Sequence, residues 1–191
     1  MLSDMAGHEH EDFRRVRSPF QGERIRLRPI EQDDLLRINE LFWDPEVSQH
    51  LSLAWPEPLA GTRAWWEGTQ RNPDTMAFAI EAGGGELVGV CSLEDADGRN
   101  RGAVLGIWIG RPFWDQGFGT DAVRTLCRFG FVEMNLQRVT LWVYETNPRG
   151  RRAYQKVGFK EEGRRRRANF VGGRHVDAIA MGLLAEDLVE L

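Results

Sequence analysis

The chain has 191 residues, 41% hydrophobic and 28% charged, a composition that is ordinary for one globular domain with a sizeable core. Its formal net charge of −4 argues against a nucleic-acid-binding protein, because such proteins present a basic surface. No run of about 18 apolar residues and no apolar signal core near the start are found, so we expect a cytoplasmic protein without a membrane partner. Cys91 and Cys127 stand in apolar patterns, which indicates reduced core thiols.

The beginning of the chain differs in character from the rest. Residues 1–20 mix histidines, acids and arginines without periodicity, so we expect a flexible tail there. His8 and His10 have no further ligands near them in the sequence, and no metal site is expected. Residues 21–191 are expected to form a single domain.

Prolines and changes of hydrophobic period divide the first half of this domain into elements. The predicted elements are a strand over residues 24–28, a helix that opens at Asp33 and Asp34 and continues through Phe42, a short helix over 46–51 and a helix over 59–71. The last of these carries Trp65 and Trp66, which cannot share one face because adjacent helical residues point in different directions. One tryptophan can therefore be core while the other meets a cleft.

Alternating apolar residues predict a mostly antiparallel sheet in the middle of the chain. The expected elements are strands over residues 75–82 and 86–94 with the triple glycine 83–85 between them, a turn over 95–100, and a central strand over 105–109. A further strand over 138–144 follows a helix, so we expect it to run parallel to the central strand.

The chain is organised around residues 104–131, where a strand and a connector lead through a Gly-x-Gly turn into a helix. Gly117 and Gly119 carry no side chains where this helix begins, so backbone N–H groups can converge on an anion such as a pyrophosphate. A turn in which the glycines serve geometry alone is the alternative. The helix is predicted from apolar residues at three-and-four spacing: Phe118, Ala122, Val123, Leu126, Cys127 and Gly130.

A dinucleotide-binding fold competes for the same stretch. Residues 117–122 match G-x-G-x-x-A, and Glu145 follows about where a ribose-binding acid would sit. Against this interpretation, residues 110–116, including Pro112, separate the strand from the turn, whereas the fingerprint follows its strand almost directly. The chain after Glu145 also lacks the further strand–helix units of a doubly wound sheet.

A second motif, N-x6-Y-x-K-x-G-F, occupies residues 147–159. Together with W-D-Q-G-F-G-T at residues 114–120, and in this order and spacing, it resembles the GNAT superfamily of acyl-CoA-dependent N-acyltransferases over about residues 23–187. The resemblance implies a single α+β domain with a mixed, mostly antiparallel central sheet, helices on both faces, and a parallel strand pair that splays at the cofactor site. It also implies that acetyl-CoA is the cosubstrate.

The resemblance also implies roles for individual residues. Tyr154 matches the tyrosine that protonates the departing thiolate as general acid, and its alternative is a packing residue on an amphipathic helix. The three arginines at 149, 151 and 152 open the helix after Asn147 and could reach the 3′-phosphate of CoA; the alternative is that they are merely exposed. The expected cofactor-binding residues are Trp108, Ile109, Trp114, Gln116, Gly117, Phe118, Gly119, Thr120, Asn147 and Arg152.

The acceptor side is less defined. In the resembled family the first helices and their loops build it, which suggests His50, Trp55 and Trp66, although tryptophans are mostly core material. Val104 stands where many relatives carry a glutamate that is sometimes proposed as base. The general base is therefore unassigned, with Glu94, Asp95 or a water relay as candidates.

The end of the chain, residues 159–164 and 173–184, resembles the closing hairpin of Rim-type acetyltransferases. Members of that branch acetylate protein N-termini, notably of ribosomal proteins, so the expected acceptor is an N-terminal α-amino group. A small-molecule amine such as an antibiotic, and a non-catalytic acyl-CoA-binding relative, are the alternatives. The arginine run 164–167 is expected to be a solvated hairpin rather than an RNA contact, and a homodimer is left open.

Overall fold

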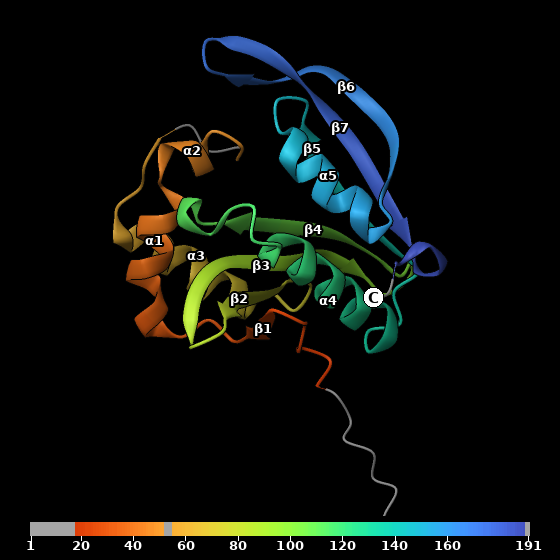
Figure 1. The fold of residues 1–191 in the computed structure, drawn as a ribbon, viewed down its shortest axis with the longest axis horizontal. Helices are drawn as coiled ribbons and strands as arrows, with labels where there is room; N and C mark the ends of the chain where they lie inside the picture. The colour runs from red at the N-terminus through yellow and green to blue at the C-terminus, as the bar shows by residue number, and fades with distance from the viewer. Residues whose placement is uncertain (1–17, 52–54, 190–191) are drawn as a thin grey trace, which may run out of the picture.

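The computed structural model describes residues 18–51 and 55–189, so most of the tail expected over residues 1–20 lies outside the described residues. The described part contains a seven-stranded sheet in the order β1-β2-β3-β4-β5-β7-β6 (Figure 1). Its strands are β1 (Ile25–Arg28), β2 (Met76–Ala82), β3 (Glu86–Asp97), β4 (Gly102–Ile109), β5 (Arg138–Tyr144), β6 (Lys160–Val171) and β7 (Arg174–Leu184). Its α-helices are α1 (Leu35–Phe42), α2 (Pro45–Ser48), α3 (Leu59–Arg71), α4 (Phe118–Val132) and α5 (Pro148–Val157).

The elements follow the predicted order, but several boundaries differ. Strand β4 begins at Gly102, three residues before the predicted start at Leu105. Strand β3 continues to Asp97, through residues predicted as a turn, because Asp97 pairs with Gly102 of β4 after an irregularity in the ladder. Helix α2 ends at Ser48, three residues before the predicted end at Leu51. The end of β3 and the start of β4 depend on the pairing between these two strands, which local pattern does not encode.

The parallel pair of strands separates along its length. Strands β4 and β5 pair only from Gly102 with Arg138 to Val104 with Thr140. Beyond this point β4 continues to Ile109 paired with β3 alone, while β5 stays paired with β7. The predicted splay is thus confirmed, and the mixed sheet, in which the other neighbouring pairs are antiparallel, excludes the doubly wound dinucleotide fold.

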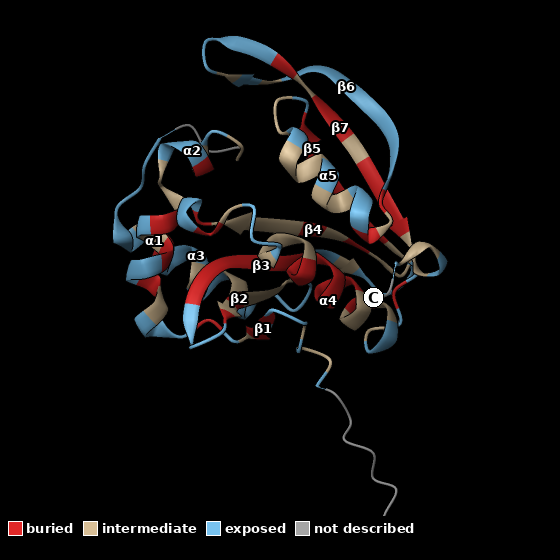
Figure 2. Ribbon diagram, in the orientation of Figure 1, coloured by how far each residue is buried: buried red, intermediate tan, exposed pale blue. Residues whose placement is uncertain are grey.

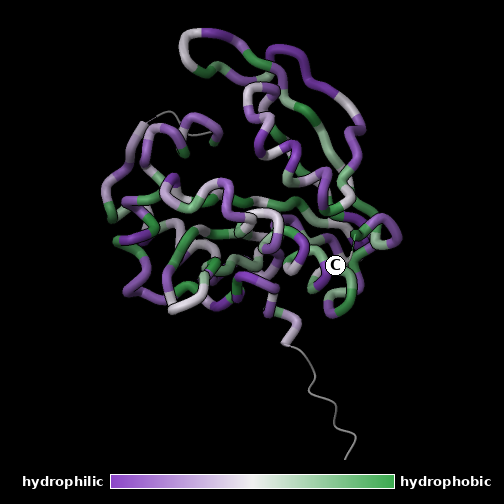
Figure 3. The backbone as a smooth tube through the Cα atoms, in the orientation of Figure 1, coloured by the Kyte–Doolittle hydropathy of each residue, from purple (hydrophilic) through white to green (hydrophobic). Residues whose placement is uncertain are grey.

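Helices cover both faces of the sheet around this split. Helix α4 contacts β1, β3, β4 and α5, whereas α1 contacts α3, β3 and β4. The buried residues concentrate in the central strands and in α4, while the outer side of the β6–β7 hairpin is exposed (Figure 2). Figure 3 shows the same division, with hydrophobic residues in the middle of the sheet and hydrophilic residues along much of β6. Both cysteines are free and buried, as predicted.

Within residues 18–51 and 55–189, each helix is too short or too polar to cross a lipid bilayer.

Asp121 joins the first strand to the helix that carries the Gly-x-Gly turn. It lies in the first turn of α4 with 6% of its surface exposed, and its Oδ2 accepts the backbone N–H groups of Arg24 at 2.7 Å and Ile25 at 3.2 Å. Asp121→Ala leaves these donors unpaired, so we expect the free energy of unfolding to fall by about 1–3 kcal/mol. Urea denaturation measures this, with the exposed Asp33→Ala as control; equal midpoints for the two variants would contradict it.

Candidate active site

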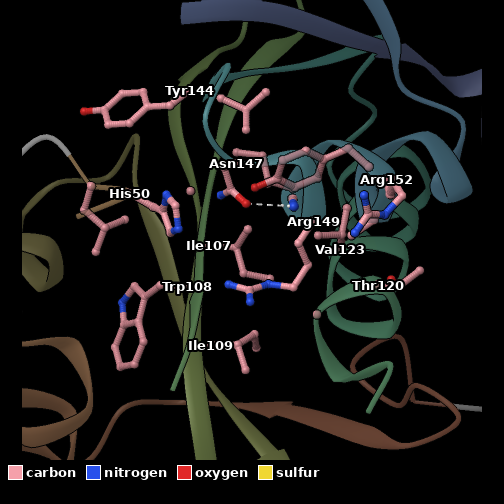
Figure 4. A pocket seen from close by; sticks show the side chains of 18 of the residues that line it. His50, Ile107, Trp108, Ile109, Thr120, Val123, Tyr144, Asn147, Arg149 and Arg152 are labelled. Carbon is pink, nitrogen blue, oxygen red and sulfur yellow. Dashed lines mark hydrogen bonds between the residues drawn. The ribbon is translucent and has the colours of Figure 1, made fainter. Parts of the chain in front are cut away.

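A cavity of about 610 Å³ lies where β4 and β5 separate (Figure 4). Strand β4 forms one wall, and the first turn of α4, helix α5, the end of β5, helix α2 and part of β6 form the others. The split of the sheet brings together these residues predicted from the sequence: His50, Trp108, Ile109, Trp114, Gly117, Phe118, Gly119, Thr120, Asn147, Arg152 and Tyr154. Motifs that lie far apart in the sequence therefore share one cavity.

The first turn of α4 faces this cavity. Gly117 is the N-cap of the helix with φ of 85°, a left-handed conformation that glycine adopts without strain. A Cβ at Gly119 would lie 3.4 Å from Cγ1 of Ile109, so the helix start stands against the end of β4. The first N–H groups of an α-helix have no partners within the helix, and its dipole makes this end positive. The arrangement is chemically suited to an anion.

Three contacts hold Trp114, which lines the cavity. Its indole Nε1–H donates to the carbonyl oxygen of Ile109 at 2.7 Å. The guanidinium of Arg149 lies 3.2 Å from the ring centre and that of Arg111 lies 4.9 Å from it. Arg111 also pairs with Glu46 of α2, Nε to Oε2, at 2.7 Å. These cation–π and ionic contacts connect α2 to α5 across the cavity, and Figure 4 shows Arg149 reaching between β4 and α4.

Asn147 ends the loop after β5 and begins α5. Its side-chain oxygen accepts the N–H of Gly150 at 2.9 Å, which caps the helix, and Pro148 occupies the first helical position. A Cβ at Gly150 would lie 2.9 Å from Nδ2 of Asn147, so glycine permits this close approach. Because the oxygen is used by the cap, the asparagine presents its amide N–H groups to the cavity side.

Tyr154 follows two turns later on α5 and is half-buried. Its ring packs on Phe159, with the ring centres 5.9 Å apart. Burial raises the pKa of its phenol to about 12, because the charged form loses hydration. The phenol therefore keeps its proton at neutral pH and can act as a donor.

His50 follows α2 and lines the opposite side of the cavity, where Figure 4 shows its ring turned toward Asn147. Its buried Nδ1 has no hydrogen-bond partner among the residues that the structure describes. Burial lowers the pKa of the imidazole from 6.5, and the positive charge of Arg149 lowers the pKa further. The imidazole is consequently neutral at pH 7 and can accept a proton.

Of the five predicted acceptor and base residues, His50 lines the cavity, whereas Trp66, Trp55, Asp95 and Glu94 do not. Trp66 donates its indole N–H to the carbonyl oxygen of Ile30 at 3.0 Å and packs on the core. Trp55 is 72% exposed outside the cavity wall. Asp95 lies at the irregularity near the end of β3, with φ of 51°. Hydrophobicity and charge alone did not indicate which way these side chains would turn.

Three predicted site residues have side chains that lie beside the cavity or turn away from it. Glu94 does not line the cavity, but it accepts a hydrogen bond from Ser92 Oγ at 2.7 Å beside the cavity residue Gly106. Gln116 turns away and donates its amide to Pro112 O at 3.1 Å. Of the arginines predicted for the 3′-phosphate, Arg151 points to Glu161 at 3.3 Å, while those at 149 and 152 line the cavity.

Sequence reasoning missed several cavity residues, among them a pair formed by an arginine and a tryptophan. Arg165 of β6 lies over the ring of Trp142 of β5, 4.1 Å from the ring centre, and both line the cavity. Trp142 was detectable as a large aromatic residue on the strand face opposite the buried Leu141 and Val143. Nothing in the arginine run 164–167 distinguished Arg165 from its neighbours.

Comparison with known proteins agrees with this geometry. The model of the acetyltransferase (GNAT) domain matches residues 24–160. The uncharacterized N-acetyltransferase YokL of Bacillus subtilis is 29% identical over 169 residues, which cover 88% of this chain and 94% of that protein. YdaF of Bacillus subtilis, provisionally named a ribosomal N-acetyltransferase, is 37% identical over 111 residues, 56% of this chain and 61% of that protein.

Polyamine enzymes are also similar. The spermidine N(1)-acetyltransferase of Escherichia coli K12 is 26% identical over 157 residues, 82% of this chain and 84% of that protein. The crystal structure of Vibrio cholerae spermidine N-acetyltransferase in complex with CoA and spermine superimposes with a TM-score of 0.81. The superposition covers 86% of this chain and 97% of the Vibrio cholerae chain, with 23% sequence identity. This similarity establishes the fold.

The fold and the split-strand cavity define an acyltransferase of the GNAT type, and the chain belongs to the GNAT acetyltransferase family. It is an acyl-CoA-dependent N-acetyltransferase whose cosubstrate is acetyl-CoA.

Proposed function

We propose that this enzyme acetylates the α-amino group of a protein N-terminus. The observation that carries this proposal is the shape of the acceptor side. A second cavity of about 540 Å³ between α2 and the β6–β7 hairpin continues the first, with Leu51, Tyr144, Ala168 and Asn169 common to both. A continuous groove of this kind suits an extended chain. The similarity to YdaF and the hairpin resembling the Rim-type branch support the same acceptor.

A polyamine acceptor, suggested by the spermidine acetyltransferases, is the second candidate. The charge of the cavity disfavours it. Among the described residues that line the cavity, Arg149, Arg152, Lys156 and Arg165 are cationic and Asp115 is the one carboxylate. Arg165, which lines the cavity beside the groove shared with the second cavity, would therefore repel a polycation.

For acetyl-CoA we propose a bound orientation that follows from the separation of strands β4 and β5. The N–H groups at the start of α4, around Gly119, hold the pyrophosphate. The free edge of β4 at Trp108 pairs with the pantetheine as an added strand would, and Asn147 donates to it. Arg152 is positioned for phosphate oxygens. This arrangement brings the thioester beside Tyr154.

The reaction then needs two proton transfers, one on each side of the thioester. The neutral amine attacks the thioester carbon, the C–N bond forms and the C–S bond breaks. Tyr154 gives its proton to the departing sulfur, while the amine loses a proton to His50, directly or through one water. An N-terminal α-amino group, with a pKa of about 7.7–8.0, suits a neutral imidazole better than a lysine or polyamine amine near 10.4 does.

The proposed base predicts a specific pH dependence. Because the pKa of His50 lies below 6.5, the rate should be constant near pH 7 and fall at lower pH as the imidazole gains a proton. Arg149 is the charged group that lowers this pKa from α5, and Arg149 itself interacts with Glu46 and Arg111. His50→Gln should lower kcat by about 10²–10⁴-fold and remove this acidic limb. Glu94→Gln is the matched comparison; a loss confined to that variant would make Glu94 the base.

A thiol-release assay tests the acceptor. Purified enzyme and acetyl-CoA are combined with peptides that carry free or blocked N-termini, with spermidine and with an aminoglycoside. We expect release with free N-terminal peptides only. Faster turnover of spermidine than of any peptide would replace the proposed acceptor by a polyamine. If no amine is acetylated although CoA raises the melting temperature, the proposed peptide acceptor is wrong.

A further inference from the structure

The irregular part of strand β6 has a defined shape. Arg165 pairs with Ala178 of β7, but the next pair is Asn169 with Val176, so residues 166–168 lie opposite Asp177 alone. This is a β-bulge with extra residues in β6, and Arg167 within it has φ of 52°. A bulge redirects the side chains beside it, and here Arg165, Ala168 and Asn169 reach the cavity.

Asp177 holds this bulge in place. Its Oδ1 accepts the N–H of Arg167 at 2.8 Å, and its Oδ2 accepts from the guanidinium of Arg164 at 3.1 Å. Its own N–H donates to Glu145 of the loop after β5 at 3.0 Å. The same contacts lower the pKa of Asp177, with the hydrogen bond from the Arg167 backbone contributing most, so the carboxylate stays ionised. Arg164 forms ion pairs with Glu145 and Asp177, whereas Arg165 lines the cavity.

Arg165 is thus oriented without being neutralised. Its guanidinium lies 4.1 Å from the ring centre of Trp142, and none of the carboxylates that the structure describes pairs with it. Stacking on an indole fixes the plane of a guanidinium while its N–H groups stay available in the plane. A fork of such donors binds a carboxylate with two hydrogen bonds.

The position of Arg165 separates it from the phosphate end of the cavity. Strand β6 lies at the edge of the sheet, with β7 and β5 between it and β4. Helix α4, whose first turn faces the cavity, instead packs on β1, β3, β4 and α5. Arg165 is also near the groove that continues toward Ala168 and Asn169, which both cavities share. Its ligand is therefore on the acceptor side.

From this geometry we infer that Arg165, stacked on Trp142 and set by the Asp177 bulge, forms a subsite for a carboxylate that the acceptor carries close to its amine. The inference rests on the proposed function, because the acceptor must enter along the groove beside the hairpin. Two sources share the chemistry: an acidic side chain in the first residues of a peptide, or the α-carboxylate of a small amino compound. Arg165 then selects acceptors by charge.

The test compares acetylation of three C-terminally amidated peptides that differ at the second residue, Asp, Asn or Lys, and of free glutamate. We expect the Asp peptide to be the best peptide. Arg165→Gln should lower kcat/KM for it by about 10–100-fold, the range for a lost charge-assisted hydrogen bond, without changing KM for acetyl-CoA. Arg165→Glu should reverse the order of the Asp and Lys peptides. Arg166→Gln removes the same charge from the adjacent residue outside the cavity and should leave the order unchanged.

Each outcome separates this inference from the proposed function. If free glutamate is acetylated in an Arg165-dependent way and all peptides are refused, the carboxylate subsite stands and the peptide acceptor is wrong. If peptides are acetylated without regard to the second residue, or equally well by Arg165→Gln, the subsite is wrong and the peptide acceptor stands. Asp177→Asn should weaken the preference for Asp over Asn; an unchanged preference would show that the bulge does not position Arg165.

Discussion

Replacing Tyr154 with Phe should lower kcat by about 10²–10⁴-fold, which corresponds to about 3–5 kcal/mol of transition-state stabilisation. The ring, which packs on Phe159, is kept, so the fold and the affinity for acetyl-CoA should survive. The loss falls on kcat because the phenol matters most when charge builds on the sulfur. With its pKa near 12, the phenol of the unmodified enzyme should cause no loss of rate through pH 9.

Steady-state thiol release with the best peptide, together with the melting temperature in the presence of CoA, measures the Tyr154→Phe effect. Equal CoA-induced stabilisation in both proteins is the control for binding and folding. If the variant turns over within about threefold of the unmodified enzyme, Tyr154 is a packing residue and water supplies the proton.

Gly119→Glu should abolish the binding of CoA while the domain stays folded. A Cβ at this position meets Ile109 only at an ordinary contact distance, 3.4 Å, so the backbone can accept it. The added carboxylate, however, lies at the start of α4, where the N–H groups and the helix dipole would otherwise meet a pyrophosphate. Like charges then repel the ligand from its site.

Thermal unfolding with increasing CoA measures the effect of Gly119→Glu. At a hundred times its dissociation constant, CoA stabilises a protein by about 2.7 kcal/mol, and the variant should lose this gain entirely. Gly119→Ala adds the same Cβ without the charge and should retain most of it. A folded Gly119→Glu protein with unchanged CoA affinity would remove the start of α4 from the cofactor site.

Most secondary structure of this protein was predictable from local pattern. The apolar spacing around Leu126 and the alternation around Val139 reflect which faces are buried, and each pattern is complete within a few residues. The two motifs containing Gly119 and Tyr154 were recognisable for the same reason, since the start of a helix and its cap are local structures. Their joint presence in one cavity was implied by the resemblance, and the structure places both motifs there.

The acceptor side was decided only when the chain folded. The sequence did not indicate which of the acceptor candidates His50 and Trp66 would face the cavity. In the structure His50 lines the cavity, while the indole N–H of Trp66 donates to a backbone carbonyl oxygen. Arg165 differs from the other arginines of its run because a bulge held by Asp177 directs it onto an aromatic ring from another strand. Such placements depend on contacts between residues that are distant in sequence. These contacts form only once the sheet has assembled, so local sequence does not reveal them. Hydrophobic periodicity in the sequence indicates which face of a helix or strand is buried. The direction of a polar side chain at the end of such an element is decided by the tertiary structure.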